Sequence, residues 1–256
     1  MGLILTERPS DGVVHLVLNR ADRRNALDLD IRKELAQRFR ELGEDATLRC
    51  VVLSGAGGCF SGGADIADMA RIDAIEMYHR HTERLWGAVA DCPVPVIASV
   101  EGFALGGGLE LAMHADIIVT HATAKLGQPE VKVGIMPGAG GTQRLMRAVG
   151  KYRAMLMCLT GDIVSGEDAA GMGLVSMLAP EGEVLERSLS IAQRIALLPP
   201  IAVAQIKEVM LAGADAPLSS ALALERKAVQ LLFATQDKTE GMTAYLEKRS
   251  PRFQGR

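Results

Sequence analysis

The chain has 256 residues, which is enough for one large domain or for a core with an appendage. Its residues are 48% hydrophobic and 23% charged, a balance that excludes intrinsic disorder as the main property. With 28 Lys and Arg against 31 Asp and Glu, the net charge of -3 provides no global positive field, which argues against a dedicated nucleic-acid binder.

The four cysteines are scattered and form no CxxC pair, and the first residues of the chain contain no apolar leader. No window approaches the roughly 18 uninterrupted apolar residues that a membrane-spanning helix needs. We therefore expect reduced, mostly buried thiols, no membrane partner and a cytoplasmic location.

Short apolar strands alternate with helix-like segments through the first two thirds of the chain, and this alternation predicts an α/β fold. Strands are expected at 13–18, 50–53, 96–100, 117–119 and 174–178, and helices at 28–42, at 71–90 and from about residue 109. Within 28–42 the apolar residues Ile31, Leu35, Phe39 and Leu42 recur at helical spacing.

From about residue 179 onward the pattern is helical only, and this change places a boundary near residue 195. Residues 1–195 are predicted to form the core, and 196–256 a helical C-terminal region. Helices are expected at 184–198, 201–212, 218–233 and 238–248. Apolar residues along one face of the third helix predict that this region packs either on its own core or on a neighbouring subunit.

Three glycine-rich loops, 55–63, 106–108 and 138–141, are expected where strands give way to helices. Glycine lets a ligand approach the backbone closely, and N–H groups at a helix start attract anions and developing oxyanions. Neither a GxxxxGK[ST] motif nor a complete GxGxxG motif is present, which disfavours nucleotide binding. Taken singly, each loop is better explained as a tight turn, but three loops beside carboxylates favour a site.

Those carboxylates are Glu110, two residues after the GGG turn, and Glu130, which follows Gln128-Pro129. Glu110 is expected in the first turn of a helix, where a backbone donor and an acid/base group can share one cavity. Glu130 stands among apolar residues, where burial would raise its pKa. The alternative interpretation makes Glu110 a helix-dipole partner and Glu130 a surface ion-pair partner.

Other chemistries have weaker support in the sequence. The five histidines show neither an HExxH motif nor metal-ligand spacing with cysteine, so no metal site is expected. A GxSxG elbow is also missing, which argues against covalent acyl transfer through a serine.

The stretch ASVEGFALGGGLELAMHADIIVTHATAKLGQPEVKVGIMPGAGGTQRLMRAVGK, residues 98–151, closely resembles the crotonase superfamily and, within it, the enoyl-CoA hydratases. Further matching stretches are LNRADRRNALD, CFSGGADIADM, LTGDIVSGEDAAGMGLVS and EGMTAYLEKRSPRFQGR, so the resemblance covers nearly the whole chain. It implies an α/β, crotonase-like spiral of ββα units followed by a helical C-terminal trimerisation region, with a homotrimer or a dimer of trimers as the assembly.

The resemblance also implies roles for individual residues. The backbone N–H groups of Ala64 and Gly107 fall on the family's oxyanion hole, which holds the thioester carbonyl of an acyl-CoA substrate. Glu110 and Glu130 fall on the two catalytic glutamates, as base toward a water and acid toward the α-carbon, and Gly138 N–H falls where that water is positioned. No cofactor is expected, since CoA is part of the substrate.

Contacts to the CoA or acyl part are expected from further residues that match the family's binding segments. These are Arg23, Arg24, Ala26, Gly63, Asp65 and Ile66, together with Tyr245 and Lys248, which would reach the CoA of a neighbouring subunit. Three positions depart from the family pattern, because Gly62 replaces an alanine, and Ala67 and Asp22 stand where basic residues are common.

The predicted activity is hydration of the C2–C3 double bond of a trans-2-enoyl-CoA to a 3-hydroxyacyl-CoA. One alternative is an enoyl-CoA isomerase or another reaction through the same enolate, against which the presence of both glutamates argues. The other is a non-catalytic assembly or RNA-associated protein on the same fold. The sequence leaves acyl-chain length open, as well as the choice among fatty-acid β-oxidation, phenylacetate degradation and amino-acid breakdown.

Overall fold

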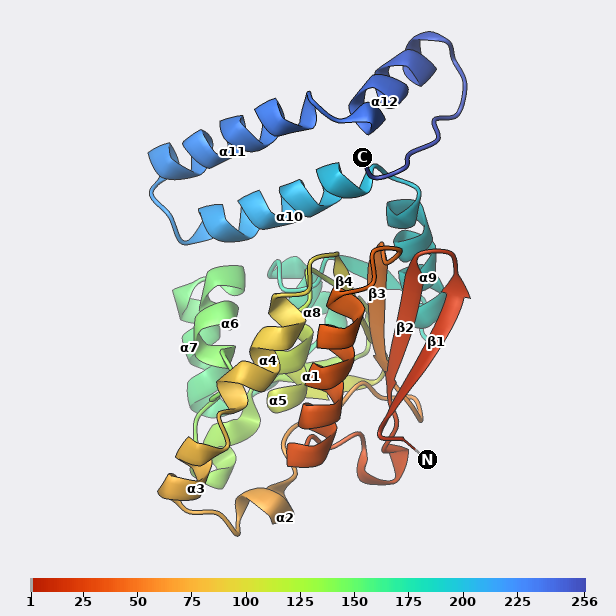
Figure 1. The fold of residues 1–256 in the computed structure, drawn as a ribbon. Coiled ribbons are helices and arrows are strands. Elements are labelled where there is room, and N and C mark those ends of the chain that lie inside the picture. Colours follow the sequence, from red (N-terminus) through yellow and green to blue (C-terminus); the bar gives the residue numbers. More distant parts are fainter. Residues whose placement is uncertain (1) are drawn as a thin grey trace.

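The computed structural model describes residues 2–256 and is built around a twisted six-stranded sheet (Figure 1). The strand order is β1-β2-β3-β4-β6-β9, and all neighbours run parallel except the antiparallel pair β1 and β2. The strands are β1 (Ile4–Ser10), β2 (Val13–Leu18), β3 (Cys50–Gly55), β4 (Val96–Val100), β6 (Ile117–His121) and β9 (Met177–Ala179). Strands β2, β3 and β4 are buried almost throughout, as expected for a parallel sheet covered on both faces.

Helices cover both faces of this sheet and create two separate apolar cores. On one face α1 (Leu29–Gly43) and α4 (Thr82–Ala90) pack together, and their buried residues join the larger core. On the other face α9 (Val184–Ala196) lies against β3 and β4 and closes the smaller core (Figure 1). The sheet is therefore a rigid wall from whose strand ends the loops emerge.

A second, three-stranded sheet lies beside the loops that follow the main strands. Its order is β5-β7-β8, from β5 (Phe103–Leu105), β7 (Lys125–Gly127) and β8 (Ile163–Ser165). The helical elements around it are short: η1 (Ala21–Arg23), α2 (Ile66–Met69), α3 (Ala74–His79), α5 (Gly107–Ala112), η2 (Pro129–Val133), α6 (Gly141–Val149), α7 (Lys151–Thr160) and α8 (Gly166–Gly171). Together they build the part of the molecule that carries the glycine-rich loops.

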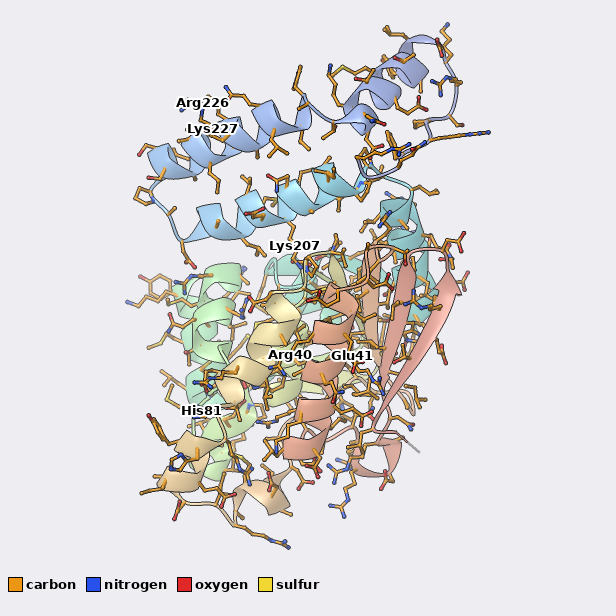
Figure 2. The ribbon with its side chains drawn as sticks, viewed as in Figure 1. Arg40, Glu41, His81, Lys207, Arg226 and Lys227 are labelled. Carbon is orange, nitrogen blue, oxygen red and sulfur yellow. The ribbon has the colours of Figure 1, made fainter. Side chains whose placement is uncertain are left out.

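The C-terminal helices α10 (Pro200–Ala214), α11 (Leu218–Leu232) and α12 (Gln236–Leu246) stand at one end of the molecule, where α10 pairs with α11 (Figure 1). Lys207 fastens α10 to the core by donating to Asp116 Oδ2 at 2.7 Å and to Val94 O at 2.9 Å (Figure 2). Leu218 and Leu222 on α11 remain 73% and 49% exposed, so this apolar face does not pack on the chain's own core.

Within residues 2–256, no single helix is long and apolar enough to cross a bilayer. Helices α9 and α10 meet that criterion only when taken together, and the chain bends by 112° between them.

The α/β class and the helical C-terminal region are confirmed, and most predicted elements lie within a few residues of their expected positions. The helix predicted over 71–90 is wrong: Asp73 caps α3, and His81, in the left-handed conformation with φ of 45°, separates α3 from α4. The strand predicted at 174–178 is displaced to β9, because Leu174 N still donates to Ala169 O at the end of α8. Strand β1 was not predicted, since as an edge strand it exposes most of its side chains.

Three of the four cysteines, Cys50, Cys59 and Cys92, are buried, and Cys158 is half-buried. All four are free thiols, as the scattered spacing predicted.

Candidate active site

A cavity of about 430 Å³ opens beside the second sheet and collects five of the predicted site residues. The lining residues are Arg32, Ala64, Met69, Met77, Thr82, Trp86, Gly107, Glu110, Glu130, Ile135, Met136, Gly138 and Ala139. A larger hollow, of about 1070 Å³, lies beside residues 233–254 and contains none of the predicted catalytic groups. The smaller cavity is therefore the candidate active site.

Two buried polar side chains hold the loop that carries Ala64. Asn25 Nδ2 donates to two backbone carbonyls of the 55–59 loop, both at 2.9 Å. Ser61 Oγ donates to Asn25 O at 2.8 Å and accepts from Gly63 N at 3.1 Å. These contacts fix the backbone on both sides of Ala64, whose N–H would otherwise have no defined direction.

The turn at 106–108 brings a second backbone N–H beside that of Ala64. Gly106 has φ of 51°, which favours glycine, and Gly107 begins α5. A β carbon at Gly63 would lie 3.3 Å from Gly107 N, and one at Gly107 would lie 3.4 Å from Ala64 N, so the two amides are neighbours. Within residues 2–256 neither N–H has a hydrogen-bond acceptor. Two free, neighbouring N–H groups on a cavity wall can stabilise an oxyanion.

Glu110 is 4% exposed and lies in the first turn of α5, as predicted. Its Oε1 accepts from Ala139 N at 2.7 Å and from Gly141 N at 2.8 Å, so the carboxylate is held by the start of α6 and not by its own helix. Burial raises the pKa of Glu110, while these two N–H groups and Arg32 oppose the rise. With Oε1 occupied twice, Oε2 is the oxygen left for chemistry.

Glu130 is half-buried on η2, and burial, with a smaller contribution from Glu110, raises its pKa to about 7. The expected pKa direction is confirmed, but the expected apolar surroundings are wrong, because Val131 and Val133 are 41% and 55% exposed. The Glu130 carboxyl group is instead covered by the GGG turn, since a β carbon at Gly106 would lie 3.0 Å from Glu130 Oε1.

The side-chain amide of the fully buried Gln128 faces the Glu130 carboxylate. With its nitrogen turned toward Glu130 it donates to Oε1 at 2.9 Å and to Oε2 at 3.1 Å. Sequence reasoning treated Gln128 only as part of a turn, because an amide two residues from an acid carries no signal of its own.

The surface-ion-pair alternative for Glu130 finds no support, because among the described residues no basic side chain pairs with it. Gly138 N likewise has no acceptor within the part of the chain that the structure describes, and Gly138 lines the cavity. The same described residues contain no group of three or more His, Cys, Asp or Glu side chains that could hold a metal ion.

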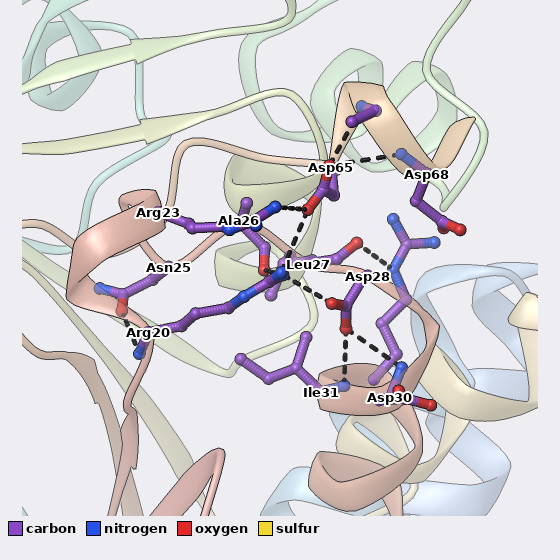
Figure 3. Close-up of polar contacts among 12 residues, drawn as sticks. Arg20, Arg23, Asn25, Ala26, Leu27, Asp28, Asp30, Ile31, Asp65 and Asp68 are labelled. Atoms are coloured by element: carbon purple, nitrogen blue, oxygen red, sulfur yellow. Dashed lines mark hydrogen bonds and ion pairs between the residues drawn. The ribbon is translucent and has the colours of Figure 1, made fainter. Parts of the chain in front are cut away.

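Three of the residues expected to contact CoA, Arg23, Ala26 and Asp65, take part in a polar network with Arg20 and Asp28 next to the loop that carries Ala64 (Figure 3). Asp65 caps α2 by accepting from the backbone of residues 67 and 68, and it pairs with Arg20 at 3.3 Å and with Arg23 at 3.6 Å. Arg20 also pairs with Asp28 at 2.6 Å. Asp65 therefore orders this edge, while the exposed side chains of Arg23, Arg24 and Ile66 are accessible to a ligand.

Tyr245 and Lys248 do not join the cavity of their own chain. Tyr245 is 84% exposed on α12, and Lys248 follows that helix with φ of 55°. Helix α12 lies at the opposite end of the molecule from α2 and α3 (Figure 1). Any contact of these two residues with a bound CoA would have to come from another copy of the chain.

Sequence analysis also missed Arg32 and Trp86, both of which line the cavity. Arg32 directly follows the buried Ile31 on α1, and its position gave no signal because a lone arginine on an amphipathic helix is usually solvated. Only the folding of 66–86 over this helix shows that Arg32 faces the cavity.

Comparisons with known proteins agree with this geometry. Residues 8–256 match the family described as enoyl-CoA hydratase/isomerase. The chain is 38% identical to a probable enoyl-CoA hydratase of Mycobacterium bovis over 98% of this chain and 97% of that protein, and 40% identical to a mitochondrial enoyl-CoA hydratase of Pongo abelii over 98% and 87%. It resembles the crystal structure of an enoyl-CoA hydratase from Bacillus anthracis with a TM-score of 0.96 and 36% identity over the full length of both chains. The chain belongs to the enoyl-CoA hydratase/isomerase family, the crotonase family that its sequence resembles.

Proposed function

We propose that this chain is an enoyl-CoA hydratase that adds water across the C2–C3 double bond of a trans-2-enoyl-CoA. The observation that carries the proposal is one cavity that combines two raised-pKa carboxyl groups with two free backbone N–H groups. Sequence relatives named for this reaction support the assignment.

In this mechanism the Ala64 and Gly107 N–H groups bind the thioester oxygen and stabilise the enolate that forms when water attacks C3. One such preorganised donor contributes roughly 100- to 1000-fold in rate in other enzymes. Both donors are backbone groups on turns held by Asn25, Ser61 and Gly106, so they need no reorganisation during the reaction.

Glu110 is the base: Oε2 removes a proton from the attacking water while Oε1 stays bonded to the α6 N-terminus. Glu130 is the acid: with a pKa of about 7 it is substantially protonated at neutral pH and delivers its proton to C2. The hydroxyl bonds to C3, the proton bonds to C2, and transfer of a proton from Glu110 to Glu130 resets the pair. Gly138 N–H supplies a donor that orients the water. The reaction is redox-neutral, and we propose that it uses no cofactor.

We further propose that Arg23, Arg24, Ala26, Gly63, Asp65 and Ile66 form the binding edge for the substrate's CoA part. The exposed basic side chains and the exposed Ile66 support this placement. The exposed apolar face of α11 and the remote Tyr245 and Lys248 support a homotrimer, or a dimer of trimers, in which a neighbouring copy completes the CoA contacts.

The test is loss of the conjugated enoyl-thioester absorbance with trans-2-enoyl-CoA substrates, measured for the wild type and for Glu110→Gln and Glu130→Gln. Each variant should lose hydration by roughly 100-fold or more, because each amide removes one proton-transfer group. Undiminished hydration in either variant would refute the residue assignment. Turnover of 3-enoyl-CoA without hydration of 2-enoyl-CoA would instead identify an isomerase.

A further inference from the structure

One wall of the candidate active site carries a positive charge. Arg32 lies in the first turns of α1, is half-buried and lines the same cavity as Glu110 and Glu130. Its Nε donates to Leu27 O at 3.0 Å, and its guanidinium carbon lies 5.3 Å from the centre of the Trp86 ring. These contacts fix the side chain in place, but they use only one of its five N–H donors.

No carboxylate neutralises this charge. Within residues 2–256, no acidic oxygen lies within ion-pair distance of the Arg32 guanidinium. The acidic groups that face it from farther away are Glu110, Asp68 and Asp28, and Arg80 faces it with like charge.

Both of the acids outside the catalytic pair are engaged elsewhere. Asp68 gives both oxygens to Arg80, at 2.6 and 3.1 Å. Asp28 accepts from the first N–H groups of α1 and pairs with Arg20 at 2.6 Å. Only the base Glu110 remains to balance the charge of Arg32. Its attraction raises the pKa of Arg32, but burial lowers that pKa by more. A desolvated cation without a partner is costly, so its retention in a cavity points to a ligand anion.

Trp86 supplies a second, independent observation at the same place. Its side chain is 4% exposed and lines the cavity, and its indole Nε1 is buried with no acceptor among residues 2–256. The ring stacks on His114 at 5.7 Å, and His114 Nδ1 donates to Glu110 O at 2.8 Å. A buried indole N–H normally has a partner, so this donor also lacks its acceptor.

We propose that Arg32 and Trp86 form a subsite for a carboxylate on the acyl chain of the substrate, so that the enzyme selects enoyl-CoA thioesters with a carboxylate at the far end. This inference rests on the proposed hydratase function and names its substrate class. The guanidinium forms the ion pair and the indole N–H donates to the same group. The thioester oxygen stays on Ala64 and Gly107, and the double bond stays beside the two glutamates.

The test compares two six-carbon substrates that differ only at the chain end: trans-2-hexenoyl-CoA, which ends in a methyl group, and the CoA monothioester of trans-2-hexenedioic acid, which ends in a carboxylate. The wild type should favour the carboxylate substrate in kcat/KM. Arg32→Gln should lower kcat/KM for that substrate by roughly 10- to 100-fold more than for the methyl substrate, because any effect of the lost charge on Glu110 is common to both substrates. Arg32→Lys should recover part of the loss because it keeps the charge.

Two further variants sharpen the result. Lys33→Gln removes an equal charge from the exposed neighbouring position on α1 and should leave the ratio of the two kcat/KM values unchanged. Trp86→Phe keeps an aromatic ring at this position but removes the indole N–H, and should lower kcat/KM for the carboxylate substrate by roughly 3- to 10-fold relative to the methyl substrate. Equal losses on both substrates in Arg32→Gln would mean that Arg32 acts only on Glu110, and would overturn the proposal. A wild-type preference for the methyl substrate would overturn it as well.

A binding measurement separates this proposal from the hydratase assignment. Calorimetry with the saturated adipoyl-CoA monothioester and with hexanoyl-CoA requires no turnover. Tighter binding of adipoyl-CoA that is lost in Arg32→Gln would support the subsite even if neither unsaturated substrate reacted, in which case the hydratase function alone would fail. Equal binding of the two thioesters by the wild type would refute the subsite.

Discussion

Replacement of Glu130 by glutamine should make the protein more stable at alkaline pH while abolishing hydration. The pKa of Glu130 is about 7 in the folded state against 4.5 for the free side chain. The folded state therefore binds the proton more tightly, and the stability that Glu130 contributes is complete below pH 4.5 and lost as pH rises to about 7. Glutamine is neutral throughout, so Glu130→Gln avoids this loss.

The expected size follows from the pKa difference. A difference of about 2.5 units corresponds to at most about 3.4 kcal/mol at 1.36 kcal/mol per unit, and solvent screening of this half-buried group reduces it to about 1–2 kcal/mol. For a chain of this size, that gain raises the Tm by about 2 to 8 °C.

The assay is thermal unfolding of the wild type, Glu130→Gln and the control Glu44→Gln at pH 5.5 and pH 8.5. Glu44 is exposed, so Glu44→Gln should have the same Tm as the wild type at both pH values. The gain of Glu130→Gln should be complete at pH 8.5 and less than half as large at pH 5.5, which lies between the unfolded pKa of 4.5 and the folded pKa of about 7. A gain of equal size at both pH values, or a loss at pH 8.5, would show that burial of Glu130 does not carry the cost assigned to it.

Three further outcomes are expected. Hydration should fall as pH rises through about 7, because the acid Glu130 loses its proton there, and a kcat profile flat from pH 6 to 9 would exclude that role. Gly141→Ala should lower kcat by roughly 100-fold or more, since a β carbon at Gly141 would lie 2.8 Å from Glu110 Oε1 and would displace the base. The matched control is Gly171→Ala, whose β carbon would have no atom within 4 Å. Equal kcat values in the two variants would contradict the reasoning. Asp237→Asn should lower the free energy of unfolding by about 1–3 kcal/mol, because the 2% exposed carboxylate accepts from two N–H groups of the C-terminal tail. Urea unfolding measures this change. An unchanged midpoint would show that Asp237 does not hold the tail.

The sequence was sufficient for groups whose positions depend on local backbone patterns. Glu110 and Gly107 could be placed because the GGG turn and the following apolar residues define the start of α5, whatever packs around them. The main strands could be placed because burial on both faces makes them continuously apolar.

What the sequence could not give depends on contacts between segments far apart in the chain. Strand β1 is specified by pairing with β2, and not by an apolar pattern of its own. The break at His81 requires a backbone conformation that no residue pattern announces. Arg32 and Trp86 meet only because α4 packs on α1, so a charge that looked solvated became part of the cavity wall.

The base and one oxyanion donor share a mechanical support that the acid does not. Glu110 and Gly107 lie three residues apart on the short helix α5, so a shift of that helix would carry both together. Glu130 lies on η2, which packs against α7, and α7 packs against α6. The Glu110 carboxylate is linked to this α6–α7 hairpin only through the N–H groups of Ala139 and Gly141. Motion of the hairpin would therefore rotate the Glu110 carboxylate and displace Glu130, while the Ala64 and Gly107 N–H groups stay where Asn25, Ser61 and α5 hold them.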